Sequence, residues 1–191
     1  MPTLLLAFVL ALAVLLLFSG LGDRAIFGDE TSTATTALDV LREGLPIPRE
    51  DDSFHRDLSV PLFGRHIIIA QPWVDKYLGA AAAVIFGRTS AGLRIPFAAI
   101  GVIFVGLMLA WGRRVLRTRG GILILATLLL GSLPLLIFLR AARYYSPTLA
   151  LIVAFEIVRI GNSSQQAPAN DKRCPRSGQV PLCTNLRPAT T

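Results

Sequence analysis

Uncharged apolar residues come in long blocks along this chain of 191 residues instead of alternating with polar ones. Runs of about 18–20 such residues are long enough to cross a hydrocarbon core of about 30 Å as helices. The pattern predicts an all-α integral membrane protein with three to four transmembrane helices and one or two juxtamembrane helices. The predicted spans are at about 4–20, 95–112, 120–139 and 146–160.

The segment between the first two apolar blocks shows helical periodicity in two places. Within Thr31–Glu43, alanine and leucine recur at helical spacing, and Gly44 followed by two prolines ends the pattern. A second apolar-rich stretch, Val74–Phe86, is too short to span a bilayer. We expect both stretches to be helices on the outer membrane face. The conformation of Val60–Ala70 between them stays open.

Charge is distributed unevenly around these blocks and predicts the orientation of the chain. The net charge is +7, yet ten of the twelve acidic residues lie between Asp23 and Asp75. The short segment Arg113–Arg119 holds four arginines and no acid. Short basic loops stay in the cytoplasm, so the acidic first loop is expected on the outer side. No base-reading motif accompanies the basic residues, which argues against a nucleic-acid partner.

The two ends of the chain leave alternatives open. We interpret the first apolar block as an uncleaved span, although its length and the small residues at 19–22 also suit a signal peptide. After a membrane domain at 1–160, residues 161–191 form a polar, proline-containing segment that we expect to be disordered. Its two cysteines, Cys174 and Cys183, have no histidine nearby and do not predict a zinc site.

Four motifs follow one another in an informative order: Asp29-Glu30, then QPWVDKYLGAAAAVIFG, LRIPFAAIG and RAARYYSPTL. From Leu4 to Phe155 this order resembles the N-terminal part of GT-C membrane glycosyltransferases. The similarity is to the bacterial branch of the protein O-mannosyltransferase and aminoarabinose-transferase superfamily. It implies transfer of a sugar from a polyprenyl-phosphate-linked donor to a protein, lipid or glycan acceptor. The reaction would occur at the outer face of the bacterial inner membrane, with the first loop in the periplasm.

The resemblance also implies site residues. The Asp-Glu pair of the family matches Asp29 and Glu30, which are the candidate catalytic residues. Inverting transfer needs a carboxylate within hydrogen-bond reach of the attacking hydroxyl, so Asp29 would be the general base or would bind the acceptor nucleophile. The leaving phosphate needs positive charge, and Lys76, Arg94 and Arg143 match the basic positions of the family. Aromatic rings suited to contact the sugar or the prenyl chain are Trp73, Tyr144 and Tyr145. No cofactor is expected, and a divalent metal is left open.

Simpler structural roles exist for the same residues. Asp29 suits the N-cap of an outer helix, Lys76 suits a snorkelling position, and Arg94 and Arg143 suit membrane anchors. The sequence also departs from the family at Gln71, where many relatives carry Lys or His. Relatives are much longer, and the change of composition after residue 160 is what a frameshift or a truncated gene would produce. The second functional hypothesis is therefore a non-enzymatic small membrane protein or assembly subunit.

Overall fold

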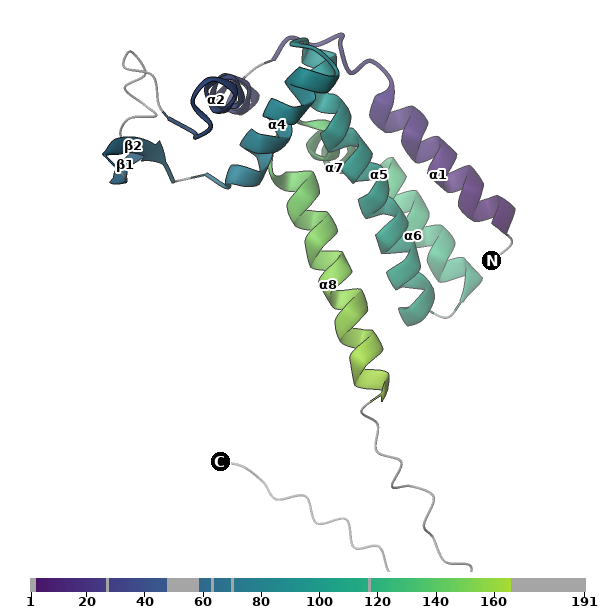
Figure 1. The fold of residues 1–191 in the computed structure, drawn as a ribbon. Helices are drawn as coiled ribbons and strands as arrows, with labels where there is room; N and C mark the ends of the chain where they lie inside the picture. Colours follow the sequence, from purple (N-terminus) through teal and green to yellow (C-terminus); the bar gives the residue numbers. More distant parts are fainter. Residues whose placement is uncertain are drawn as a thin grey trace, which may run out of the picture.

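A computed structural model of the chain describes residues 3–26, 28–47, 59–62, 64–69, 71–116 and 118–165. These residues form seven helices and one small antiparallel hairpin (Figure 1). The prediction of a mostly helical chain is confirmed, and the hairpin is the exception to the all-α expectation. Most of the predicted polar tail, including both cysteines, lies outside the described residues.

The helix α5 (Ser90–Val115) is central, because five other helices pack against it (Figure 1). Thr89 begins it as an N-cap, with its side chain accepting a hydrogen bond from the backbone N–H of Gly92. Four of these helices form the bundle with α5: α1 (Thr3–Phe18), α6 (Arg119–Gly131), α7 (Leu133–Arg140) and α8 (Tyr145–Gln165).

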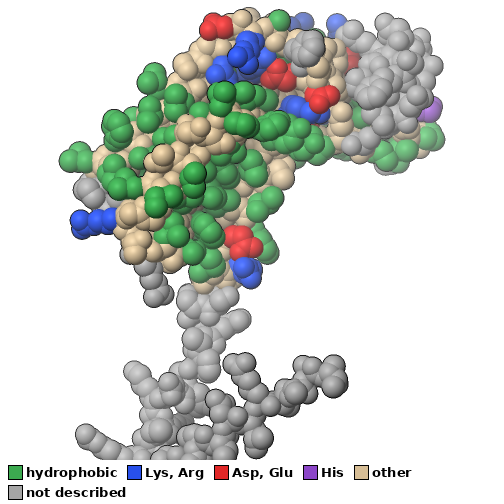
Figure 2. All heavy atoms as spheres, turned by 180° about the vertical axis from the view of Figure 1, so that it is seen from behind, with side chains coloured by type: hydrophobic (Ala, Val, Ile, Leu, Met, Phe, Trp, Pro, Cys, Tyr) green, Lys and Arg blue, Asp and Glu red, His purple; other side chains and the backbone are tan. Residues whose placement is uncertain are grey.

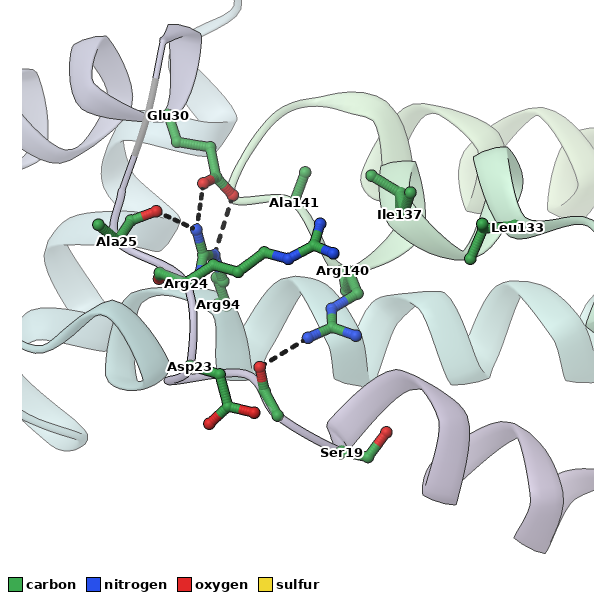
Figure 3. A pocket seen from close by; sticks show the side chains of 11 residues that line it. Ser19, Asp23, Arg24, Ala25, Glu30, Arg94, Leu133, Ile137, Arg140 and Ala141 are labelled. Atoms are coloured by element: carbon green, nitrogen blue, oxygen red, sulfur yellow. Dashed lines mark hydrogen bonds and ion pairs between the residues drawn. The ribbon is translucent and has the colours of Figure 1, made fainter.

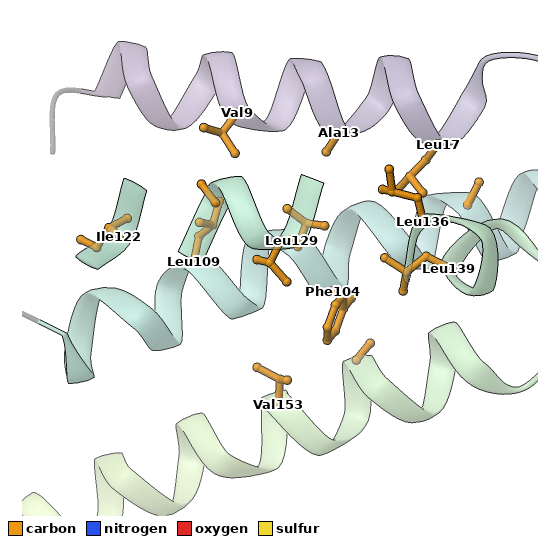
Figure 4. Packing of buried hydrophobic residues seen from close by; sticks show 14 of the residues in the cluster. Val9, Ala13, Leu17, Phe104, Leu109, Ile122, Leu129, Leu136, Leu139 and Val153 are labelled. Carbon is orange, nitrogen blue, oxygen red and sulfur yellow. The ribbon is translucent and has the colours of Figure 1, made fainter. Parts of the chain in front are cut away.

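Aliphatic and aromatic side chains from all these helices form one core (Figure 4). Leu17 from α1, Val105 from α5 and Leu139 from α7 have no measurable exposed surface. Gly101 allows α5 to approach α7 closely, since a Cβ at this position would lie only 3.1 Å from the Cβ of Leu139. The core therefore depends on close helix–helix contact as well as on burial of large side chains.

Among the described residues, α5 is the one continuous helix long and apolar enough to cross a membrane. The block predicted as a single span at 120–139 is instead two helices, α6 and α7, bent by 65°. Ser132 leaves the helical conformation with a ψ of 94°. Pro134 follows in the first turn of α7, where a missing N–H costs nothing. The helix α8 continues to Gln165, past the predicted boundary at residue 160.

Two further helices and the hairpin lie at one end of the bundle (Figure 1). The helix α2 (Asp29–Glu43) packs on α4 (Trp73–Ile85), and α4 in turn packs on α5. The prediction that both stretches are helical is confirmed, including the end of α2 at Gly44, which has a left-handed φ of 75°. The strands of the hairpin are β1 (Ser59–Leu62) and β2 (Arg65–Ile68), with Ser59 paired to Ile68.

The surface divides into an apolar part and a charged part. Hydrophobic side chains cover the helical bundle, whereas most Lys, Arg, Asp and Glu side chains in this view gather at the end near α2 and α4 (Figure 2). Leu128 on α6 and Phe155 on α8 are examples of apolar residues with 65% and 68% of their surface exposed. The site residues predicted from the sequence belong to the charged end.

Candidate functional site

Arg94, near the start of α5, is buried and joins three separate parts of the chain. Its Nε and Nη2 donate to the two carboxylate oxygens of Glu30 at 3.1 and 2.5 Å. Nη1 donates to the carbonyls of Leu21 and Arg24 at 2.9 and 2.8 Å, and Nη2 to that of Ala25 at 3.2 Å. These five hydrogen bonds use every N–H donor of the guanidinium. Arg94 therefore has a structural role here and no donor left for a phosphate.

Glu30 completes the same junction. Besides its bonds with Arg94, its Oε1 accepts a hydrogen bond from the backbone N–H of Ala142 at 2.9 Å. Ala142 lies in the turn between α7 and α8, so Glu30 connects that turn to the start of α2. Its side chain is only 13% exposed. The Glu30 carboxylate therefore has a structural role, because its oxygens accept hydrogen bonds from Arg94 and from the backbone of Ala142.

The neighbouring Asp29 points to solvent and has a different set of contacts. It forms an ion pair with Arg143, and its side chain is 72% exposed while that of Arg143 is 15% exposed. The cap position of α2 is occupied by Gly28, with a φ of 58°, and no side chain caps the helix. The interpretation of Asp29 as an N-cap is therefore wrong, although its place in the first turn still suits the helix dipole.

Two tyrosines surround the guanidinium of Arg143. Nη1 donates to the Tyr145 hydroxyl at 3.2 Å, and Cζ lies 5.5 and 5.4 Å from the ring centres of Tyr144 and Tyr145. A hydrogen bond with Tyr145 and the charge on that group raise the pKa of Tyr144. The Tyr144 hydroxyl therefore stays protonated. Asp29, Arg143, Tyr144 and Tyr145 form one group, which we call the Asp29 site.

Lys76 lies in a buried polar cluster between α2 and α4. Its Nζ donates to Gln71 Oε1 at 2.6 Å and to Thr33 Oγ1 at 3.2 Å, and lies 3.2 Å from Asp75 Oδ2. Burial lowers the pKa of Lys76, while Asp75 opposes that shift. With only 1% of its surface exposed, Lys76 neither snorkels nor faces a ligand. Gln71, at the position where the resemblance to the transferases predicts Lys or His, is a direct partner of Lys76.

Trp73 lies apart from the Asp29 site. Its indole Nε1 donates to the carbonyl of Ile68 at 2.8 Å, so the ring connects α4 to the end of β2. The structure thus brings together four of the predicted site residues in the Asp29 site. Glu30 and Arg94 form a separate, mostly buried ion pair, and Lys76 and Trp73 make other contacts.

A pocket of about 660 Å³ lies between the end of α1, the following loop and the end of α7 (Figure 3). Arg24, Arg94 and Arg140 line it together with Asp23 and Glu30. Sequence reasoning missed Arg24 and Arg140. The available signal was the presence of one arginine just after each of the first and third apolar blocks.

No group of three or more His, Cys, Asp or Glu side chains in the described parts of the chain could hold a metal ion. The fold and the site thus define a mostly helical protein with one candidate span and a charged, tyrosine-flanked site at one end of the bundle. No family model, curated protein or solved structure matches the chain.

Proposed function

We propose that the chain is an integral membrane protein of the bacterial inner membrane, with the Asp29 site at the outer face. Exposed Leu128, Leu151 and Phe155 support contact between the bundle and lipid, because their surfaces would otherwise face water. Arg113 and Arg114 lie at the opposite end of α5, where short basic segments favour the cytoplasmic side. In this arrangement α5 and the bent pair α6–α7 cross the membrane, and we propose that α1 and α8, which fall short of a span in length or in hydropathy, complete the bundle within it.

Cysteine labelling tests the orientation. With Cys174 and Cys183 replaced by serine, a single cysteine at Ser32 should react in intact cells with a membrane-impermeant maleimide once the outer membrane is opened. A single cysteine at Thr118, beside the arginine segment, should react only after the inner membrane is broken. The reverse pattern would contradict the proposed orientation.

We further propose that the Asp29 site transfers a sugar from a polyprenyl-phosphate-linked donor. The acceptor hydroxyl oxygen would attack C1 of the sugar and give its proton to an Asp29 carboxylate oxygen. The bond between C1 and the phosphate oxygen would break, and its electron pair would leave with the lipid phosphate. The observation that supports this proposal most is the difference between the two adjacent carboxylates. Glu30 is mostly buried in its ion pair with Arg94, whereas Asp29 is exposed and paired with Arg143.

Arg143 is the basic residue best suited to the leaving phosphate. Lys76 and Arg94 are buried and bonded to protein acceptors. Arg143 uses Nη1 for Asp29 and Tyr145, and its other N–H groups make no hydrogen bond to the described residues. A guanidinium can hold a phosphate through two parallel N–H groups. Tyr144 and Tyr145 would flank the same phosphate or the sugar.

A transfer assay tests this proposal. Membranes containing the full chain are incubated with radiolabelled polyprenyl-phosphate mannose, and label is counted in protein, lipid and glycan fractions. Loss of a general base costs about 100- to 10,000-fold in rate, so Asp29→Asn should abolish measurable transfer. Arg159→Gln, at the far end of α8, is the matched control. Unchanged transfer in Asp29→Asn would remove Asp29 from the mechanism.

The second candidate is a non-enzymatic membrane subunit. It is favoured by the hydrogen bonds of Arg94 and Lys76 to other protein groups, which give two of the three predicted phosphate ligands a structural role. It predicts that a crosslinker captures the chain with one defined membrane protein, equally in the parent and in Asp29→Asn. A chain recovered alone under those conditions, with transfer activity present, would exclude it.

A further inference from the structure

Two arginines that line the pocket at the end of α1, Arg24 and Arg140, have N–H groups without a hydrogen-bond partner among the described residues. Arg140 donates from Nη2 to the carbonyl of Gly20 at 2.8 Å, and its remaining N–H groups make no hydrogen bond to the described residues. Arg24 is exposed, and its side chain has neither a hydrogen bond nor an ion pair within the described part of the chain. Both side chains extend into the pocket (Figure 3).

The charges around this pocket leave a positive surplus. Glu30 neutralises Arg94 in a close ion pair. Of the other lining residues, Arg24 and Arg140 are cationic and Asp23 is anionic. Asp29, Lys76 and Arg143 are not among the lining residues. The pocket is therefore a cationic region distinct from the Asp29 site.

Arg94 lines this pocket and shapes its loop, but all its N–H groups are bonded within the protein. Its hydrogen bonds to the carbonyls of Leu21, Arg24 and Ala25 fix the backbone of the loop that carries Arg24. Arg140 is attached to the same loop through Gly20. The backbone that carries Arg24 and the guanidinium of Arg140 are therefore fixed before a ligand arrives, which lowers the entropy cost of binding.

We propose that Arg24 and Arg140 bind a phosphate group in this pocket, independently of sugar transfer. Guanidinium groups match phosphate oxygens bidentately, and two of them can neutralise a monoester or diester. One wall of the pocket is apolar: Leu133 and Ile137 on α7 line it and are 67% and 40% exposed. That wall suits a hydrocarbon chain attached to the phosphate, as in an anionic membrane lipid, and a free phosphate ion shares the same head-group chemistry.

A ligand-dependent unfolding experiment tests this site. The full chain in an uncharged detergent is titrated with dioctanoyl phosphatidic acid, with dioctanoylglycerol as the same chains without phosphate, and with inorganic phosphate. Binding to the folded state raises the unfolding temperature in a concentration-dependent way. Arg24→Gln/Arg140→Gln should weaken the apparent affinity about tenfold or more, because two charge-assisted contacts are lost. The matched control is Arg113→Gln/Arg119→Gln, which removes the same charge far from the pocket.

The outcomes separate the possible sources of the phosphate. A shift with phosphatidic acid alone, lost in the pocket variant and kept in the control, supports a lipid ligand. An equal shift with inorganic phosphate, lost in the same variant, supports the site with a free anion. No shift with either compound, or equal shifts in the parent and the pocket variant, overturns the proposal.

Two further variants keep the result interpretable. If the double variant unfolds without ligand, Arg24→Gln alone replaces it, because the Arg24 side chain makes no contact that the described fold needs. It should still weaken binding several-fold, and full affinity in this variant would also overturn the proposal. Asp29→Asn should bind phosphatidic acid as the parent does, so a failure of sugar transfer and a failure of this site give different results.

Discussion

Glu30 and Arg94, sixty-four residues apart, form a two-pronged ion pair that fastens the start of α2 to α5. The adjacent Asp29 takes part in a separate, exposed pair with Arg143. Two neighbouring carboxylates that look equivalent in the sequence therefore differ in burial, partners and availability. The difference has direct consequences for stability.

Glu30→Gln should lower the free energy of unfolding by about 3 kcal/mol, because removing one partner leaves the other charge buried. Asp29→Asn should cost less than about 1 kcal/mol, because exposed ion pairs contribute little. Thermal or denaturant unfolding of the purified chain in detergent compares the two. Equal losses in both variants would show that the Glu30–Arg94 junction is not the dominant attachment.

Arg94→Lys should release the loop after α1 even though the charge is kept. A lysine has only three donors and no planar fork, so it cannot hold Glu30 and the carbonyls of Leu21, Arg24 and Ala25 together. We expect a loss of about 2 kcal/mol and faster tryptic cleavage after Arg24. Arg143→Lys is the control, and cleavage should stay slow there. Equally slow tryptic cleavage after Arg24 in the Arg94→Lys variant would show that the Arg94 hydrogen bonds do not hold the loop.

The Lys76–Asp75 pair predicts strong non-additivity. Lys76→Met alone should destabilise the chain by about 3–5 kcal/mol, since Asp75 would remain buried without its partner. Adding Asp75→Asn should recover most of that loss, because no buried charge remains. A double-mutant cycle on the free energy of unfolding measures the coupling. Additive effects would mean that the two side chains act separately.

Stability should also rise with pH because of Lys76. Its folded-state pKa is lowered by burial from the ordinary value of 10.5. Between these two pKa values the unfolded chain binds more protons than the folded chain, so the free energy of unfolding increases as pH rises. Below the lowered pKa both states are protonated and this dependence vanishes. Measurements kept below pH 10 avoid the titration of Tyr144, whose raised pKa has the opposite effect.

The Lys76→Met/Asp75→Asn variant provides the control for this pH dependence. It should show a flatter stability profile than the parent over the same range, because the titrating lysine is gone. An identical rise in both proteins would assign the effect to another group.

Two glycines should respond oppositely to alanine. At Gly101 a Cβ would meet the Cβ and the carbonyl oxygen of Leu139 at 3.1 and 3.2 Å, so Gly101→Ala should separate α5 from α7 and cost about 1–3 kcal/mol. At Gly120, in the first turn of α6, a Cβ meets nothing within 4 Å. Gly120→Ala should be neutral or stabilise by up to about 1 kcal/mol through helix propensity. Unfolding temperatures in detergent compare the two, and stabilisation by both would show that the α5–α7 contact can relax.

The local pattern of the sequence determined most of the helices. Apolar blocks without charges predicted the helices of the bundle, and helical spacing before Gly44 predicted α2, because these signals act over a few neighbouring residues. The break at Ser132 and Pro134 was missed, since hydropathy alone does not distinguish a straight helix from two bent ones. The hairpin between α2 and α4 was left open for a similar reason: its short strands carry little periodicity.

Only the tertiary structure decided what the charged residues do. The resemblance stated from the sequence predicts that Asp29, Glu30, Lys76, Arg94 and Arg143 belong to one site. In the folded chain these five residues fall into separate groups, because each side chain's role depends on partners many residues away in the sequence. Arg24 and Arg140 show the same limit: they face one pocket because α1 and α7 pack against each other. Helix formation is a local property of the chain, whereas burial and pairing of charge arise from contacts that exist only after folding.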